Sequence, residues 1–420
     1  MTSFQTGAAT LGGLLVLGAL LTGLARRSIL SLAAVFVLAG FILGKGAIGV
    51  LEFEPDSAFV SGLATAGLIL ILFRDGLEVE SELLTRHWHL PLRHLAVGMP
   101  ITALLVALLA RVFVGLGWDE SLLLGALLSP TDPILSSRVV TDERVPAVVR
   151  HTLNLESGLN DGLALPAVLA FAAALEPRNT GFVWWHYVLQ DIGLGLVYGL
   201  VLGVIGSLLL PAGGGDGPAQ PAAGRQKALY CIGLALATYG LTVIPPHGNG
   251  FIAVFVAAIV VGNRRADLRS AFAEHAEGIV EIVKLGIFAV FGSLLTLSAL
   301  FHDGWAAIAV VAGTFLLARP VAIFLALAGT NVSRTSKTFM AWFGPKGVAT
   351  ITFSVLILAK GVEGGQRVVD LAALAVFCSI LVHGASETPA IRWIARRERA
   401  PARTGDRGGG ALEVAPDRLE

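Results

Sequence analysis

The chain has 420 residues and a formal net charge of zero, with 55% hydrophobic and only 14% charged residues. Soluble domains carry about 25% charged and about 45–50% apolar residues. The mean hydropathy is +0.76, so soluble, coiled-coil, collagen-like and disordered classes are excluded. No basic surplus points to nucleic acid, and two cysteines, Cys231 and Cys378, are too few for a disulfide framework or a zinc site. We expect a membrane protein without a cofactor or a nucleic-acid partner.

Apolar stretches recur along the whole chain. A membrane-crossing helix needs roughly 20 apolar residues. No basic residue precedes the first stretch, whereas Arg26 and Arg27 follow it, which is the reverse of a cleaved secretory signal. The sequence predicts an all-α polytopic membrane protein with about 13 transmembrane helices, at about 8–24, 29–44, 57–78, 94–115, 119–140, 149–175, 185–210, 228–244, 249–262, 278–300, 304–328, 338–359 and 366–390.

Basic residues separate the connecting loops into two alternating sets. One set carries only Lys45, Arg178, Lys360 and Arg367. Basic loops stay in the cytoplasm, so we expect an odd number of spans in a cell (inner) membrane, an N-terminus outside and a cytoplasmic C-terminus. The other set carries thirteen basic residues: Arg26, Arg27, Arg86, Arg93, Arg144, Arg150, Arg225, Lys227, Arg264, Arg265, Arg269, Arg334 and Lys337.

Proline and glycine interrupt two of the expected spans. The fifth contains Ser129-Pro130-Thr131-Asp132-Pro133, and the twelfth contains Gly344-Pro345-Lys346-Gly347. They lie seven spans apart and enter the membrane with opposite sense, and such a matched pair of broken segments points to a transporter site. The alternative is two ordinary proline kinks.

The same symmetry predicts the domain organisation. We expect one transmembrane unit over residues 1–393, with inverted repeats at about 8–177 and 228–393 and a flexible linker at about 211–227. A short cytoplasmic tail at 394–420 is expected to be disordered.

Two acids, Glu156 and Asp161, lie inside the otherwise apolar sixth span. An ionisable residue at membrane depth costs several kcal/mol and indicates a functional site. At about 100° per residue, Ser157, Asn160 and Asp161 share a helix face, whereas Glu156 lies about 140° round from Asp161. The two carboxylates therefore point in different directions and should have different partners.

Asp161 is the candidate ion carrier. A carboxyl group in a low-dielectric site holds its proton more readily than one in water. If a small cation replaces this proton and the site opens alternately to each side, exchange results. Ser157 and Asp161 supply side-chain oxygens, Thr131 a carbonyl or hydroxyl oxygen, and Asn160 orients the carboxylate. The alternative is that Asp161 only pairs with a basic neighbour and fastens helices together.

The other intramembrane charges are expected to balance one another. Arg319, late in the eleventh span, is the natural partner of Glu156, with snorkelling to the cytoplasm as the alternative. Asp132 would offset the positive end of the helix that follows it or bind the ion directly. Lys346 would neutralise a facing helix C-terminus.

Further charges end the third span and open the tenth. Arg74 and Glu78 have the spacing of an interfacial i, i+4 pair. Glu277, Glu281 and Lys284 either sense pH at the cytoplasmic face or simply form a solvated helix start.

Together these motifs resemble monovalent cation:proton antiporters of the NhaP/NHE type (CPA1-like). The resemblance covers about residues 8–395 and is carried by Thr131-Asp132-Pro133, by Glu156-Ser157-x-x-Asn160-Asp161-Gly162, by Arg319 and by the Gly-x-Lys-Gly break. It implies 13 helices, with a dimerisation domain and a six-helix core that contains two crossed unwound helices. It also implies a homodimer whose core moves like an elevator.

The resemblance also assigns roles. Asp161 would bind the cation and the proton, and an Asn-Asp pair goes with electroneutral one-for-one exchange. Thr131, Asp132 and Ser157 would shape the site, and Glu156 would pair with Arg319. The chain departs from its relatives at Lys346, where arginine is more common, and at Gly158 and Leu159, where bulkier residues are common.

The expected activity is exchange of Na⁺ or Li⁺ for H⁺. K⁺/H⁺ exchange with the same residues is the closest alternative. A sodium-coupled symporter of an organic solute uses similar broken helices but needs a larger polar cavity, and a channel does not need a titrating acid. An enzyme is not expected, because the spans contain no metal-binding His/Glu set and no nucleophile–base pair.

Overall fold

A computed structural model describes residues 32–51, 53–79, 88–132, 137–176, 183–210 and 221–399, together with a few isolated positions before residue 17. Within these residues every regular element is a helix, as the composition predicted. Most of the first expected span, at about 8–24, and residues 211–220 of the expected linker lie outside the described part, whereas residues 221–227 of that linker are helical. The last helix continues to Arg399, so residues 394–399 of the expected tail are helical, and 400–420 are not described.

Helices follow one another with short connections, and π-helical segments (η) interrupt several of them. The first half contains α2 (Leu32–Leu43), α3 (Ala58–Glu78), α5 (His89–Arg93), η1 (His94–Gly98), α6 (Met99–Leu109), η2 (Ala110–Val114), α7 (Trp118–Leu128), α8 (Ser137–Thr141) and α9 (Ala147–Ala174). The middle of the chain contains α10 (Trp184–His186), η4 (Tyr187–Gly193), α11 (Leu194–Leu209), α12 (Pro221–Thr242), α13 (Gly250–Arg264), α14 (Ala266–His275) and α15 (Glu277–Leu294). The last part contains α16 (Leu297–Leu300), α17 (Gly304–Gly313), η5 (Thr314–Ala318), α18 (Arg319–Ala326), α19 (Arg334–Trp342), α20 (Val348–Ala359) and α21 (Gly365–Arg399).

Many of these helices match the expected membrane spans. By length and composition, six in the described part can cross a membrane: Ala58–Glu78, His89–Val114, Ala147–Ala174, Trp184–Leu209, Gly304–Ala326 and Gly365–Glu398. Three shorter apolar helices are Ala34–Leu43, Gly250–Arg264 and Val348–Ala359. The chain is therefore a multi-pass membrane protein. The described helices do not establish the total of 13, because the first stretch lies outside them and the fifth and twelfth spans are interrupted.

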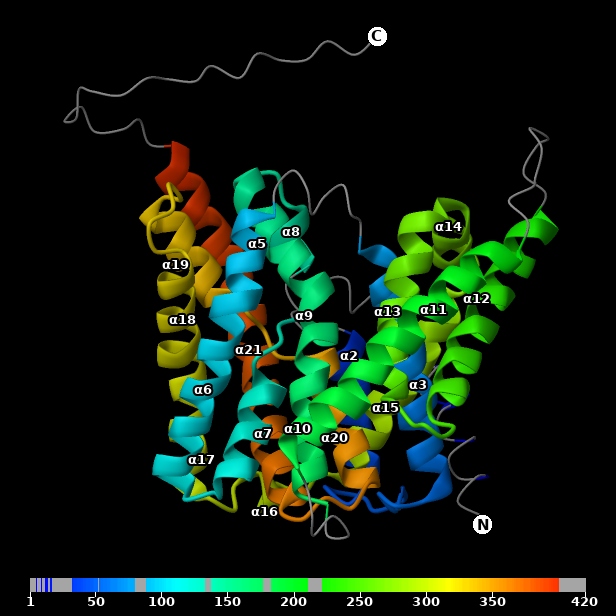
Figure 1. Cartoon of the computed structure of the whole chain (residues 1–420). Coiled ribbons are helices and arrows are strands. Elements are labelled where there is room, and N and C mark those ends of the chain that lie inside the picture. Colours follow the sequence, from blue (N-terminus) through cyan, green and yellow to red (C-terminus); the bar gives the residue numbers. More distant parts are fainter. Residues whose placement is uncertain are drawn as a thin grey trace.

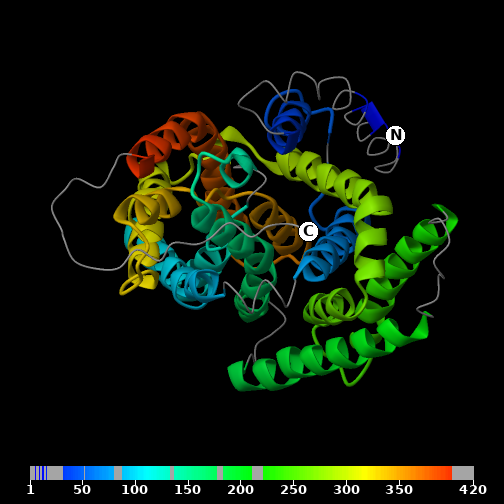
Figure 2. The same ribbon diagram turned by 90° about the horizontal axis from the view of Figure 1, so that it is seen from above.

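Seen from above, the helices form two groups (Figure 2). One contains α5–α9 and α17–α21, and the other contains α2, α3 and α10–α15. Helix α3 packs against α13 and α15 of its own group and against α9 and α20 of the other. Helix α15 also contacts α20, and α13 contacts α9. We call this meeting of α3, α9, α13, α15 and α20 the junction.

Two non-helical segments meet in the core. Helix α7 ends at Leu128, and residues 129–132 are not helical; the chain is likewise non-helical at 343–347, between α19 and α20. Pro130 and Pro345 account for the breaks, since proline has no N–H and disfavours a helical residue before it. The Asp132 amide donates a hydrogen bond to the Pro345 carbonyl oxygen at 2.8 Å. The two breaks singled out in the sequence therefore touch one another.

Candidate functional site

Charged side chains satisfy the helix ends at this crossing. The buried Lys346 ammonium donates to the carbonyl oxygens of Ser129 and Pro130, at 3.4 and 3.1 Å, beyond the C-terminus of α7. The Asp132 carboxylate accepts a hydrogen bond of 2.9 Å from the Val348 amide, the first of α20. A cation suits the partial negative charge of a helix C-terminus, and an anion suits an N-terminus. Each break therefore supplies the charge required by the helix end at the other break.

This arrangement differs from the expectation for Asp132. We expected its carboxylate to offset the helix that follows it in the sequence, but the next described helix, α8, begins only at Ser137. The helix that Asp132 caps is α20, more than 200 residues away. Sequence periodicity gave no means of seeing this, because the cap depends on how the two breaks cross.

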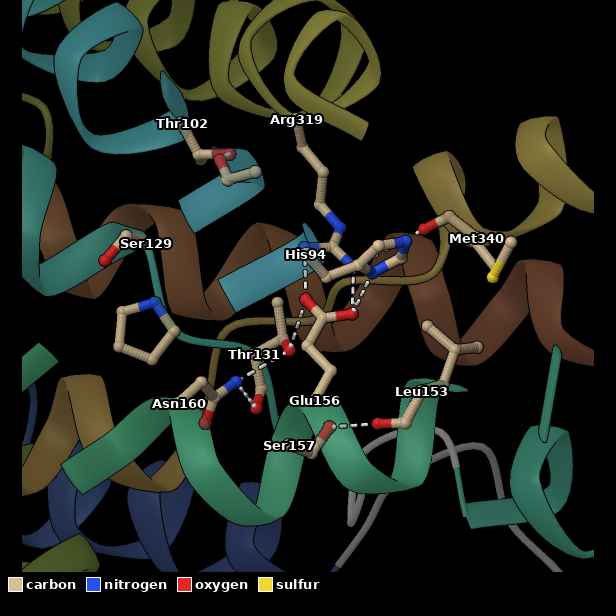
Figure 3. A network of polar contacts seen from close by, with 12 residues as sticks. His94, Thr102, Ser129, Thr131, Leu153, Glu156, Ser157, Asn160, Arg319 and Met340 are labelled. Atoms are coloured by element: carbon tan, nitrogen blue, oxygen red, sulfur yellow. Dashed lines mark hydrogen bonds and ion pairs between the residues drawn. The ribbon is translucent and has the colours of Figure 1, made fainter. Parts of the chain in front are cut away.

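Glu156 lies at the centre of a buried polar network (Figure 3). Arg319 donates from Nη1 to Oε1 at 2.9 Å and from Nη2 to Oε2 at 3.3 Å. The Nδ1 atom of His94 lies 2.8 Å from Oε2, and the Thr131 hydroxyl lies 3.4 Å from Oε1. Glu156, Arg319 and His94 are 5%, 4% and 1% exposed. Both oxygens of the carboxylate therefore have hydrogen-bond partners.

His94 is the member of this network that the sequence analysis missed. It lies at the start of the fourth expected span, where a histidine reads as an ordinary interfacial residue. Pro100, six residues later, was the one available signal, since a proline inside a span indicates an irregular helix nearby.

Glycine makes room for the arginine of this network. A Cβ atom on Gly344, in the second break, would overlap the Arg319 guanidinium. The guanidinium also donates to the carbonyl oxygen of Phe343 at 3.1 Å. Arg319 therefore ties Glu156 on α9 to the second break and does not extend to the cytoplasm.

Asn160 connects the network to the first break. Its Nδ2 atom donates to the Thr131 carbonyl oxygen at 2.8 Å and to the Thr131 hydroxyl at 2.9 Å. The side chain is 1% exposed, and its Oδ1 atom has no hydrogen-bond partner among the described residues. The amide is thus fixed through its nitrogen and keeps an oxygen available.

Asp161 and Ser157 occupy the neighbouring face of α9, and both are partly exposed. The Ser157 hydroxyl donates to the Leu153 carbonyl oxygen of its own helix at 2.9 Å. Across residues 32–399, apart from the stretches not described, no side chain forms an ion pair or hydrogen bond with Asp161. A Cβ on Gly158 would meet open space, whereas one on Gly162 would overlap the Phe255 ring of α13. Asp161 is therefore partly exposed at the junction, and it has no ion-pair partner among the described residues such as a fastening role requires.

Charged groups of both helix groups act on this carboxylate. The groups that act on Asp161 electrostatically are Asp75, Asp132, Arg74 and Lys284, from α3, the first break and α15. Arg74 donates to Asp75 at 2.6 and 2.8 Å and to Glu277 at 3.3 Å.

Two expectations for these charges change. Glu78 does not accept a hydrogen bond from Arg74 in the described structure; Asp75 and Glu277 take its place. Lys284 is only 6% exposed and so does not belong to a solvated helix start, whereas Glu281 is exposed.

A cavity of about 360 Å³ opens further along α9, towards its C-terminal end. Leu169, eight residues beyond Asp161 and therefore about 12 Å along the helix, lines it together with Glu176, Asp191 and Lys360. Both helix groups contribute to its walls. In the described chain no three His, Cys, Asp or Glu side chains are placed to hold a metal ion together.

Known proteins resemble this chain over most of its length. The family model described as the transmembrane sodium/hydrogen exchanger matches residues 14–393. The K(+)/H(+) antiporter NhaP2 of Shewanella baltica (strain OS223) is 28% identical over 91% of this chain and 65% of its own length. The K(+)/H(+) antiporter NhaP of Alkalimonas amylolytica is 26% identical over 91% of this chain and 66% of its own length. The chain thus spans just under two thirds of these relatives.

A solved structure shares the fold. The sodium proton antiporter MjNhaP1 from Methanocaldococcus jannaschii superposes with a TM-score of 0.80 at 20% identity, covering 94% of this chain and 100% of that one. The resemblance drawn from the motifs is confirmed. Since the family model covers nearly the whole chain, the protein belongs to the transmembrane sodium/hydrogen exchangers, a family of secondary transporters and not of enzymes.

Proposed function

We propose that the protein is a secondary active antiporter that exchanges Na⁺ or Li⁺ for H⁺ by competition at Asp161. The observation that carries this proposal is the partly exposed Asp161 carboxylate, which lies at the junction of the two helix groups and has no hydrogen bond or ion pair in the described part of the chain. An intramembrane acid without a basic partner is costly unless it binds a proton or a cation in turn.

Oxygen atoms suited to an alkali cation are present on the same helix and at the first break. Hard cations prefer carboxylate, hydroxyl and carbonyl oxygens. Ser157 and Asn160 lie on the same helix, and Oδ1 of Asn160 has no other described partner. Thr131 and Asp132 stand at the first break, where Thr131 keeps a second lone pair on its carbonyl oxygen. We assign the cation site to Asp161, Ser157, Asn160 and Thr131, with Asp132 shaping it.

Electroneutral exchange follows from the number of titrating acids. Glu156 is held by Arg319 and His94, so Asp161 is the one acid of this helix that remains to exchange its ligand. One proton and one Na⁺ carry the same charge. A single carboxylate that holds either of them therefore moves no net charge in a complete cycle.

K⁺/H⁺ exchange through the same residues is the second candidate. The names of two relatives from Shewanella and Alkalimonas favour it, whereas the structural neighbour is named a sodium proton antiporter. The site atoms are the same in both cases. A sodium-coupled organic solute symporter is less well supported, because the polar atoms near Asp161 are those of a small-ion site.

The rest of the proposal concerns the transport cycle. We place the protein in the cell (inner) membrane as a homodimer that serves pH homeostasis, with its N-terminus outside and its C-terminus in the cytoplasm. The two non-helical segments would be the breaks of two crossed, discontinuous spans in an inverted repeat. The group with α9 and α20 would slide against the group with α3, α13 and α15, so that Asp161 faces each side alternately.

Proteoliposomes with an entrapped pH dye test this function. Under an imposed pH gradient, Na⁺ or Li⁺ should dissipate the gradient, and clamping the membrane potential should not change the rate. Asp161→Asn should abolish exchange, while Glu363→Gln, which changes an exposed acid in a loop, should leave it intact. Exchange retained by Asp161→Asn would remove the assigned carrier. A potential-dependent rate would exclude electroneutrality, and a response to K⁺ alone would select the second candidate.

A further inference from the structure

His94 is a buried histidine whose two ring nitrogens have different surroundings. Its Nδ1 atom lies 2.8 Å from Oε2 of Glu156, and its Nε2 atom is buried without a hydrogen-bond partner in the described chain. Because a carboxylate only accepts hydrogen bonds, the hydrogen of this contact belongs to Nδ1. His94 therefore donates to Glu156.

The local backbone explains how His94 reaches this position. The π-helical segment η1 begins at His94 and ends just before the turn that contains Pro100. Pro100 has no N–H, so the carbonyl of Ala96 loses its helical partner, and the wider π-helical turn accommodates the gap. Segments of this kind recur at functional sites.

The second half of the chain contains a similar π-helical segment next to a proline. The π-helical segment η5 ends at Ala318, directly before Arg319 and Pro320. Segment η1 packs against α18, and η5 packs against α6. Two proline-associated irregular helices, one from each half, thus deliver His94 and Arg319 to the same carboxylate.

Hydrogen bonds connect this carboxylate to the ion site. Oε2 of Glu156 takes His94, whereas Oε1 lies at Thr131. The Thr131 hydroxyl has one hydrogen; since it receives a hydrogen bond from Asn160 Nδ2, it can give its own to Glu156. This order of donors keeps the nitrogen of Asn160 on Thr131, and Oδ1 of Asn160 has no hydrogen-bond partner in the described chain.

We propose that His94 is a positioning residue of the cation site. By donating to Oε2 of Glu156 it fixes the rotation of that carboxylate, which holds Thr131 and through it Asn160. Arg319 already binds both carboxylate oxygens of Glu156, so we assign to His94 a further restraint on the orientation of Oε2. The inference rests on the proposed cation site at Asp161.

Two substitutions separate orientation from simple packing. Asn places its Nδ2 near the position of the histidine Nδ1, whereas Leu has a similar bulk and no donor. In proteoliposomes, His94→Leu should raise KM for the cation about tenfold, as expected for a lost hydrogen bond to a charged group, with kcat changed less than about twofold. His94→Asn should restore a KM close to that of the parent. His247→Leu, a change at an exposed loop histidine, is the matched control.

Unchanged KM in both His94 variants would overturn the inference. So would a His94→Leu protein that folds poorly while its KM stays normal and Asn fails to rescue it, since this is the signature of a purely structural role.

A second readout separates this inference from the proposed function. In detergent, Na⁺, Li⁺ or K⁺ should raise the thermal unfolding temperature of the parent and of His94→Asn at lower concentrations than for His94→Leu. Equal midpoints in all three proteins would overturn the role of His94 even if no exchange occurred. A parent protein that exchanges no cation would instead end the antiporter proposal.

Discussion

At the scale of single residues, the two carboxylates of α9 differ in their hydrogen-bond partners. Glu156 is saturated by Arg319, His94 and Thr131, whereas Asp161 has no partner among the described side chains. Breaking a buried ion pair costs about 3–5 kcal/mol, because the remaining charge is left uncompensated. We therefore propose that Glu156 has a structural role and that Asp161 is the acid that exchanges its ligand.

Gly344→Ala tests how tightly Arg319 is held. The added Cβ would overlap the guanidinium, so Arg319 must shift away from Glu156. We expect a loss of about 1–3 kcal/mol in stability, as in other overpacked sites, seen as a lower unfolding temperature. Gly278→Ala, whose Cβ would meet open space, is the control. An equally stable Gly344→Ala protein would show that Arg319 has room to move.

Helical periodicity explains what the sequence predicted at this scale. It separates the faces of Glu156 and Asp161 and so predicts different partners for them, and charge alone selects Arg319 as a partner for Glu156. The contact between Glu156 and His94 could not be predicted, because it depends on a π-helical register that a fixed rotation per residue does not describe.

At the scale of elements, the main feature is that each break supplies a charged side chain to the helix end at the other break. Lys346 closes α7, and Asp132 caps α20. Each break exposes backbone groups inside the membrane, where water cannot satisfy them. The two segments therefore stabilise each other. The sequence predicted both breaks and their charges from proline and glycine, but which helix end each charge serves depends on the crossing itself.

Asp132→Ala should destabilise the start of α20. The Val348 amide would lose its acceptor in a buried site, which costs about 2 kcal/mol. Asp132→Asn keeps an oxygen acceptor and loses only the charge, so its effect should be about half as large. Thermal unfolding in detergent measures both. The control is Asp119→Ala, which removes an exposed acid from the first turn of α7. Equal unfolding temperatures for Asp132→Ala and its parent would show that the cap contributes nothing.

At the scale of the whole molecule, two helix groups meet around the site. The composition predicted the all-helical membrane class, and the motifs predicted the family. The assignment of each helix to a group was not predictable, since lipid-facing and protein-facing apolar surfaces have similar composition. Helix α3 shows this, because it joins the group of α13 and α15 although it also contacts α9 and α20.

The distribution of charge relates this architecture to the membrane. Helices α8, α14 and α19 and the final turns of α21 lie at one end of the molecule, and α16 with the last residues of α20 lies at the other (Figure 1). The first end carries most of the basic residues counted in the loops, and because basic loops tend to remain inside, we propose that this end faces the cytoplasm.

Single cysteines at the two ends test this orientation. Glu143 and Glu363 are exposed and lie in loops at opposite ends, before α9 and after α20. With Cys231 and Cys378 replaced by alanine, a membrane-impermeant thiol reagent added to intact cells should label Glu363→Cys at once. It should label Glu143→Cys only after the membrane is permeabilised. The reverse pattern would mean that the protein has the opposite orientation, so that the cytoplasmic and external faces of the transport cycle would be exchanged. Labelling of both positions in intact cells would mean that the number of spans between them is not odd.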